Sequence, residues 1–144
     1  MVKKIKQNKG YRMMDGLAMG TKGRSGEEAI GEYVGILFMA RNYAHKAHLK
    51  TPSYAAHAAL NGFYDCVVGF ADAIAEQAQG KFGKIEIEDV DMIGSIDNPI
   101  KGLEMQLRRL NDIRSGCSIG SIKNEMDAVE GLYLKTLYLL KELS

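Results

Sequence analysis

Residues 45–76, HKAHLKTPSYAAHAALNGFYDCVVGFADAIAE, decide the fold of this 144-residue chain. The segment predicts two helices joined by a turn at Lys50-Thr51-Pro52, because threonine caps a helix and proline suits its first position. His45 and His57 each lie six residues from Thr51. In an antiparallel helix pair, this symmetry predicts that their imidazoles lie at the same height on facing helices.

The same stretch carries carboxylates in a pattern that favours metal binding. Asp72 and Glu76 are four residues apart and share one face of the second helix, as do His57 and Asn61. Imidazoles with carboxylates form the mixed nitrogen and oxygen set that iron, zinc and manganese accept. His57 and Asp72 are separated by roughly 22 Å along one helix, too far to bind one ion within a chain. Two copies packed antiparallel about a two-fold axis would bring the histidines of one to the acids of the other.

Helix signals continue on both sides of this segment. Ser25-Gly-Glu-Glu28 has the sequence of a capping box, and Asn98-Pro99 repeats a cap followed by proline. Gly80 is expected to end the second helix, and Ser115-Gly116 the third. The four expected helices cover about residues 26–49, 51–79, 98–115, and 118 or 121 to 143. Their predicted inward positions are Ile30, Val34, Leu37, Phe38 and Ala44 in the first, Leu103, Leu107, Leu110 and Ile113 in the third, and Ile122, Met126, Val129, Tyr133, Leu137 and Leu140 in the fourth.

A long connection, residues 80–97, separates the second and third helices. Residues 84–90 alternate apolar and polar side chains, which predicts a short strand-like or extended segment. The resulting class is all-α: a ferritin-like four-helix bundle with up-down-down-up connectivity and one long crossover between the second and third helices.

Composition favours one domain. Apolar residues are 46% and charged residues 26% of the chain, and no apolar run is long enough to span a membrane. No signal-peptide core follows the N-terminal lysines, so a cytoplasmic location is the default expectation. Cys66 and Cys117 lack CxxC spacing and are expected to be buried reduced thiols.

Charge is unevenly distributed. Residues 1–26 carry a net charge of +6, which leaves −5 for the rest of a chain whose total is +1. We expect residues 1–24 to form a flexible basic tail and residues 25–144 the bundle. A basic arm on an acidic body is typical of nucleic-acid binding, although such a tail can also be merely solubilising or dock on a protein. The candidate DNA-binding residues are Lys3, Lys4, Lys6, Lys9, Arg12, Lys22 and Arg24.

The segment from His45 to Glu76 resembles the ferroxidase segment of the Dps-type mini-ferritins, the DNA-binding proteins from starved cells. That family reads approximately H-x11-H-x3-D-x10-D-x3-E, and this chain carries His45, His57, Asn61, Asp72 and Glu76 at those intervals. The resemblance implies two-fold dimers that build a hollow dodecamer. Fe(II) would be oxidised by peroxide or dioxygen at the dimer interface, with ferric iron stored inside and DNA bound by the tail.

In this resemblance His45, His57, Asp72 and Glu76 are the catalytic and metal ligands, with Asn61 as a further ligand. Zinc or manganese could substitute for iron.

The chain also departs from the family. Asn61 replaces an aspartate, and Lys46 stands where a tryptophan is usual. His48 either supplements the site or faces solvent. Two alternatives stay open: a ferritin-like assembly or binding protein with a degraded or non-redox metal site, and a site within one chain that joins Asp72 and Glu76 to Glu28 or Glu32. The second alternative leaves both histidines unexplained.

Overall fold

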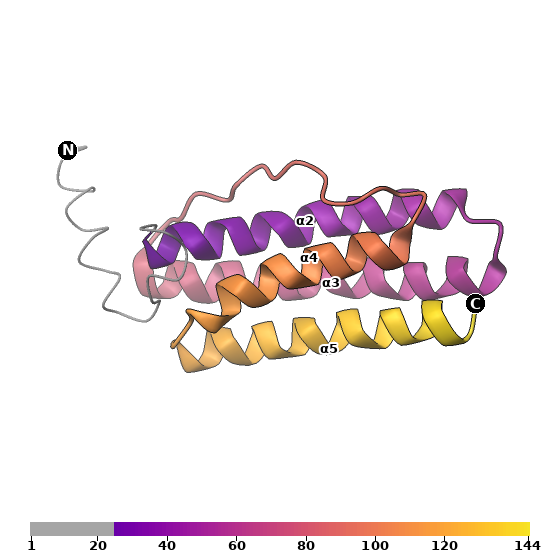
Figure 1. The fold of residues 1–144 in the computed structure, drawn as a ribbon. Coiled ribbons are helices and arrows are strands. Elements are labelled where there is room, and N and C mark those ends of the chain that lie inside the picture. The colour runs from indigo at the N-terminus through magenta and orange to yellow at the C-terminus, as the bar shows by residue number, and fades with distance from the viewer. Residues whose placement is uncertain (1–24) are drawn as a thin grey trace.

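The computed structural model describes residues 25–144, and these residues form four α-helices with no strand among them. The prediction of an all-α four-helix bundle is confirmed. Figure 1 shows the helices lying lengthwise beside one another. No helix in the described part of the chain is long and apolar enough to cross a membrane. The helices are α2 (Gly26–Lys50), α3 (Tyr54–Phe82), α4 (Pro99–Ser115) and α5 (Gly120–Glu142).

Capping signals set most helix ends. The predicted capping box is present at the start of α2, where Ser25 Oγ accepts from Glu28 N at 3.2 Å and Glu28 Oε1 accepts from Ser25 N at 3.0 Å. At the start of α4, Asn98 Oδ1 accepts from Lys101 N at 3.2 Å, and Pro99 fills the first turn.

The predicted start and the predicted end of the second helix are both wrong. Thr51 closes α2, because its N–H donates to Ala47 O, and Ser53 instead caps α3 by accepting from Ala56 N. The helix then continues through Gly80 to Phe82. Gly83, with φ of 84°, is the residue that ends it, because glycine adopts positive φ without steric cost.

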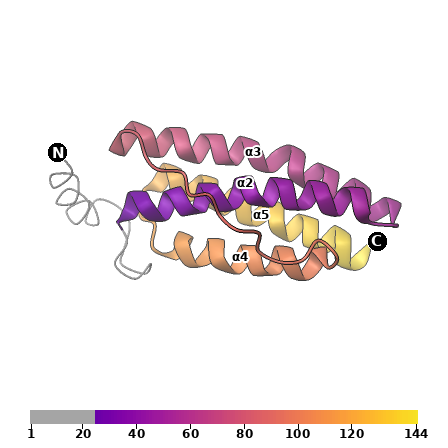
Figure 2. The same ribbon diagram turned by 90° about the horizontal axis from the view of Figure 1, so that it is seen from above.

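The helices pack as a four-membered ring in which α2 contacts α3 and α4, and α5 contacts the same two helices. Figures 1 and 2 show that α2 and α5 run in one direction while α3 and α4 run in the other. Consequently, α3 and α4 both begin at the end of the bundle where α2 ends.

Residues 83–98 connect the far end of α3 to the start of α4 by passing along the outer side of α2 (Figure 2). They contact α2 at Gly31 and Gly35, where an added Cβ would overlap the carbonyl oxygens of Glu86 and Glu88, respectively. The predicted extended segment has no strand partner among the described residues; one backbone bond, Glu88 N to Gly31 O at 3.2 Å, ties it to the helix. Tyr43 anchors its end by donating to Ser95 O at 2.7 Å.

The core confirms the predicted inward positions of the third and fourth helices, all of which are buried. In α2 the apolar stripe is buried except Phe38, which is 39% exposed, so that assignment is wrong. The burial prediction holds for Cys117 but not for Cys66, which is exposed on α3; both are free thiols. Gln106 links the core to the connection, accepting from the Tyr133 hydroxyl at 3.0 Å and donating to Ile93 O at 3.0 Å.

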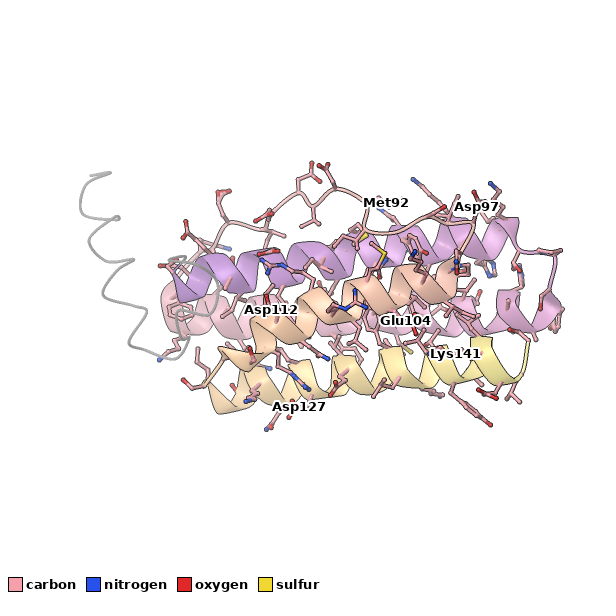
Figure 3. All side chains as sticks on the ribbon, in the orientation of Figure 1. Met92, Asp97, Glu104, Asp112, Asp127 and Lys141 are labelled. Carbon is pink, nitrogen blue, oxygen red and sulfur yellow. The ribbon has the colours of Figure 1, made fainter. Side chains whose placement is uncertain are left out.

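Ion pairs join α4 to its neighbours. Arg109 donates to both carboxylate oxygens of the largely buried Glu32 at 2.6 Å, and these hydrogen bonds raise the pKa of the guanidinium. Arg114 bridges to Glu130 of α5 at 2.7 Å. Figure 3 shows Glu104 of α4 and Lys141 of α5 on adjacent helices, where they form a 2.7 Å pair. Ion pairs therefore hold α4 to both α2 and α5.

Candidate metal centre at the helical hairpin

The α2–α3 hairpin brings three imidazoles together at one end of the bundle. The rings of His48 and His57 stack with centroids 3.5 Å apart and planes inclined by 23°. His45 lies one turn before His48 on α2, with a 5.8 Å edge contact between the rings. Of the three, His48 is buried and the other two are half-buried.

His48 and His57 form a reciprocal clasp across the hairpin. His48 Nδ1 lies 2.8 Å from His57 O, and His57 Nδ1 lies 2.9 Å from His48 O. A carbonyl oxygen can only accept, so each Nδ1 carries its proton and donates. In the neutral ring, Nε2 then keeps the lone pair that can bind a metal ion.

The clasp limits how these two rings can bind metal. Imidazole binds an ion in the plane of its ring, and the planes of His48 and His57 are nearly parallel at 3.5 Å. One ion cannot lie in both planes at a ligand distance of about 2.0–2.1 Å. In this arrangement, His48 therefore holds and orients His57 rather than sharing an ion with it.

His45 takes part in a second stack. Its ring lies 4.3 Å from the ring of Tyr64, and the Arg41 guanidinium lies 5.3 Å from the centre of the same tyrosine ring. The Tyr64 hydroxyl donates to Asn61 Oδ1 at 2.8 Å, and Asn61 Nδ2 donates to Asp65 at 2.8 Å. The amide oxygen expected to coordinate metal is therefore already accepting a hydrogen bond.

Asp72 and Glu76 lie farther along α3 and are exposed, with no hydrogen bond or ion pair to the described residues. By helix length, Asp72 and Glu76 lie roughly 22 and 28 Å from His57. Within residues 25–144 of one chain, no three His, Cys, Asp or Glu side chains are grouped closely enough to hold a metal ion. The predicted ligand set is thus brought together only in part: the histidines and Asn61 at the hairpin, the carboxylates elsewhere.

The expected pairing of His45 with His57 differs from the observed stacks, in which His48 faces His57 and Tyr64 faces His45. The turn is centred between Pro52 and Ser53 rather than at Thr51, which moves His48 opposite His57. The sequence did not indicate that Tyr64 stacks on His45 or that Arg41 lies over the Tyr64 ring. Ser53, a second residue able to cap the following helix, was the available signal for the shift.

The buried tyrosines and the Cys117 thiol of the core stay neutral near neutral pH. Burial raises the pKa of Tyr43 to about 12 and raises the pKa values of Tyr33 and Tyr133 as well. Burial likewise raises the pKa of the Cys117 thiol. These groups therefore provide packing and hydrogen bonds rather than acid or base chemistry. The predicted DNA-binding residues, all between Lys3 and Arg24, lie outside the described residues.

Together, the fold and the hairpin define an all-α four-helix-bundle protein with candidate metal ligands at one end and on the outer face of α3. The chain belongs to a protein family of unknown function, DUF5856, whose model matches residues 48–140. It is also similar to an uncharacterized 14.6 kDa protein from the mobD-ri intergenic region of Enterobacteria phage T4. The two are 28% identical over 110 residues, which cover 76% of this chain and 85% of the phage protein. No solved structure matches the chain significantly.

Proposed function

We propose that this protein is a Dps-like mini-ferritin, in which two-fold dimers bind Fe(II) at inter-subunit sites and oxidise it. The observation that carries the proposal is the division of the ligand set along α3. Oriented imidazoles lie at the hairpin, and Asp72 and Glu76, which have no hydrogen bond or ion pair to the described residues, lie roughly 22 and 28 Å from His57 along the same helix. An antiparallel second copy would bring its carboxylates to the imidazoles of the first copy, and its imidazoles to the carboxylates of the first. The dimer would then have two equivalent sites.

The outer face of α3 supports close packing of such a copy. It carries a row of small side chains, and a Cβ added at Gly62, Gly69 or Gly80 would meet nothing within 4 Å. A glycine inside a helix costs roughly 0.5–1 kcal/mol relative to alanine, so glycines without a neighbour call for another reason. Close approach of a second helix is such a reason. The small residues along this face are Ala55, Ala58, Gly62, Cys66, Gly69, Ala73 and Gly80.

Their positions also specify a register. Gly62 and Gly69 lie equally far from the point between Asp65 and Cys66, and so do Ala58 and Ala73. An antiparallel pair centred there places glycine opposite glycine. The same register brings Asp72 of one copy beside the turn between His57 and Asn61 of the other, where the predicted site needs a carboxylate.

At such a site, carboxylates would neutralise Fe(II) and the imidazole Nε2 atoms would complete an open coordination sphere. Peroxide would take one electron from each of two ferrous ions: two Fe(II), one hydrogen peroxide and two protons yield two Fe(III) and two waters. Harder Fe(III) favours the carboxylates further. Dodecamer formation, iron storage and salt-sensitive, sequence-independent DNA binding by the basic tail belong to the same proposal.

One observation favours a second candidate, a ferritin-like assembly or binding protein with a non-redox metal site. Asn61 supplies an amide where the resembled family has a carboxylate, and its oxygen already accepts from Tyr64. A site with one anionic ligand fewer binds hard cations more weakly.

Subunit complementation tests the shared site. One variant carries His45→Gln and the other carries Asp72→Asn with Glu76→Gln. The second variant changes two exposed groups that have no hydrogen bond or ion pair to the described residues. Its stability should therefore stay within about 0.5 kcal/mol of wild type. Each variant alone should lose iron oxidation. Subunits unfolded and refolded together should recover activity, because one site of each mixed dimer contains only native ligands.

Three outcomes decide between the candidates. Recovery on mixing supports the inter-subunit ferroxidase. Metal binding without oxidation, in wild type as well, favours the non-redox assembly. A native mass equal to that of one 15.9 kDa chain would end the shared-site proposal.

A further inference from the structure

A groove of about 400 Å³ lies between α2 and residues 87–92 of the connection. It forms because the connection is pressed against α2 at Gly35 and then moves toward α4, where Gly94 meets Gly102. Figure 2 shows this oblique path over α2, and Figure 3 marks Met92 on it. The groove is lined in part by Phe38, Asn42, Lys46, Ile87, Asp89 and Met92.

Three large apolar side chains lie exposed at this groove: Phe38 at 39%, Ile87 at 39% and Met92 at 43%. Single exposed apolar residues are ordinary, but a cluster around a concave surface marks a docking site. The connection adds negative charge: residues 84–91 contain four exposed acids and one lysine. The groove therefore suits a basic segment with apolar side chains.

We propose that the N-terminal segment of this same chain, residues 1–24, docks in this groove. The segment has the complementary chemistry: its centre, Tyr11-Arg-Met-Met14, places an arginine among three large apolar side chains, with Lys3, Lys4, Lys6 and Lys9 before it. Methionine adapts well to irregular apolar surfaces. Attraction to the acids of the connection steers the lysines to the groove rim.

The length of the segment permits docking within one chain. Residue 25 begins the described structure, and Phe38 to Lys46 lie 13 to 21 residues farther along, roughly 20–32 Å at helical rise. An extended chain spans up to about 3.3–3.6 Å per residue, so 24 residues cover this distance with length to spare. The inference stands apart from the proposed iron chemistry, because it requires neither metal nor DNA.

Limited trypsin digestion of the full chain tests the docking, with cleavage after Lys9 followed by mass spectrometry. Docking protects this bond, so Met92→Gln should speed its cleavage roughly fivefold to tenfold. This is the change expected if the variant weakens docking about tenfold. Leu134→Gln is the matched control, because Leu134 is comparably exposed at 53% but lies on α5, away from the groove. It should leave the rate unchanged.

Salt separates charge attraction from apolar contact. Raising the salt to roughly 1 M shortens the Debye length to about 3 Å and should speed the same cleavage in wild type. In the variant with Asp89→Asn and Asp91→Asn, the bond after Lys9 should be cleaved rapidly already at low salt. Added salt should then leave the cleavage rate unchanged. Equal rates for wild type, Met92→Gln and Leu134→Gln would overturn the proposal. Protection that grows with protein concentration would place the segment of a second copy in the groove and overturn docking within one chain.

Discussion

In α2, Gly31 and Gly35 lie directly beneath the connection, and a side chain at either position would overlap a backbone carbonyl oxygen. In α3, Gly62 and Gly69 lie on the outer face, with nothing within 4 Å of an added Cβ. The same residue type, in adjacent helices of 25 and 29 residues, is thus covered by the chain itself in one case and left open by the described residues in the other. The comparison indicates that the glycines of α2 are covered within the chain, whereas those of α3 are not covered by the described residues.

The two helices also differ in how their acids are held. Glu32 on α2 is buried and paired with Arg109. Asp72 and Glu76 on α3 are exposed and have no partner among the described residues. Small side chains and carboxylates without a partner among the described residues therefore lie on the same helix.

The largest effect is expected from filling the α2 glycines. Gly31→Ala with Gly35→Ala forces the connection off the helix, and overpacking costs about 1–3 kcal/mol per site against a gain of about 1 kcal/mol in helix propensity. We expect the free energy of unfolding to fall by about 2–4 kcal/mol in urea titrations. Gly80→Ala, at an open position of α3, serves as the control. A double variant as stable as wild type would contradict the assigned role of these glycines.

A slightly smaller effect is expected at alkaline pH, because Tyr43 ties the connection to α2. Its pKa rises from about 10 in the unfolded chain to about 12 in the folded one. The folded state therefore holds this proton more tightly, and the resulting stability is complete below pH 10 and is lost as pH rises toward 12. About 2–3 kcal/mol should disappear across this window.

Tyr43→Phe checks that assignment. The variant lacks the hydroxyl that donates to Ser95 O, so it should lose about 1 kcal/mol at neutral pH. Its free energy of unfolding should then fall less than that of wild type between pH 10 and 12. Some decline should remain, because burial also raises the pKa values of Tyr33 and Tyr133. An identical decline in both proteins would remove Tyr43 from this explanation.

The smallest effect is expected on α3, and it has the opposite sign. Gly62→Ala and Gly69→Ala should each raise the unfolding free energy of the separated chain by about 0.5–1 kcal/mol, since only helix propensity changes. The same variants should weaken self-association in analytical ultracentrifugation, because two added methyl groups would separate the paired helices. Unchanged self-association would show that these glycines do not form an interface.

Local signals predicted the helices well. The capping box at Ser25 and the cap with proline at Asn98 both formed, because each satisfies backbone groups by contacts only three residues away. The turn after α2 was placed less well, since Thr51 and Ser53 can both cap a helix. The structure uses Ser53 for α3 and lets Thr51 Oγ1 accept from Ser53 N.

The residues of the candidate site were predicted from the sequence, but the contacts among their side chains were not. The sequence identified His45, His57, Asn61, Asp72 and Glu76 as a set and showed that one chain cannot bring the whole set together. The facing of His48 with His57, and the engagement of Asn61 by Tyr64, depend on how two helices are offset across the turn. A shift of about one residue in the turn exchanges one imidazole for another.

The sequence by itself determined which segments are helical, where most of them begin, and how far apart the candidate ligands lie, because these follow from capping and from helical rise and periodicity. Only the tertiary structure decided that Phe38 and Cys66 are exposed, and that the glycines of α2 are covered while those of α3 are open. Periodicity specifies the faces of a helix but not which neighbour covers each one. That depends on the path of residues 83–98, which lies over α2 and not over the outer face of α3.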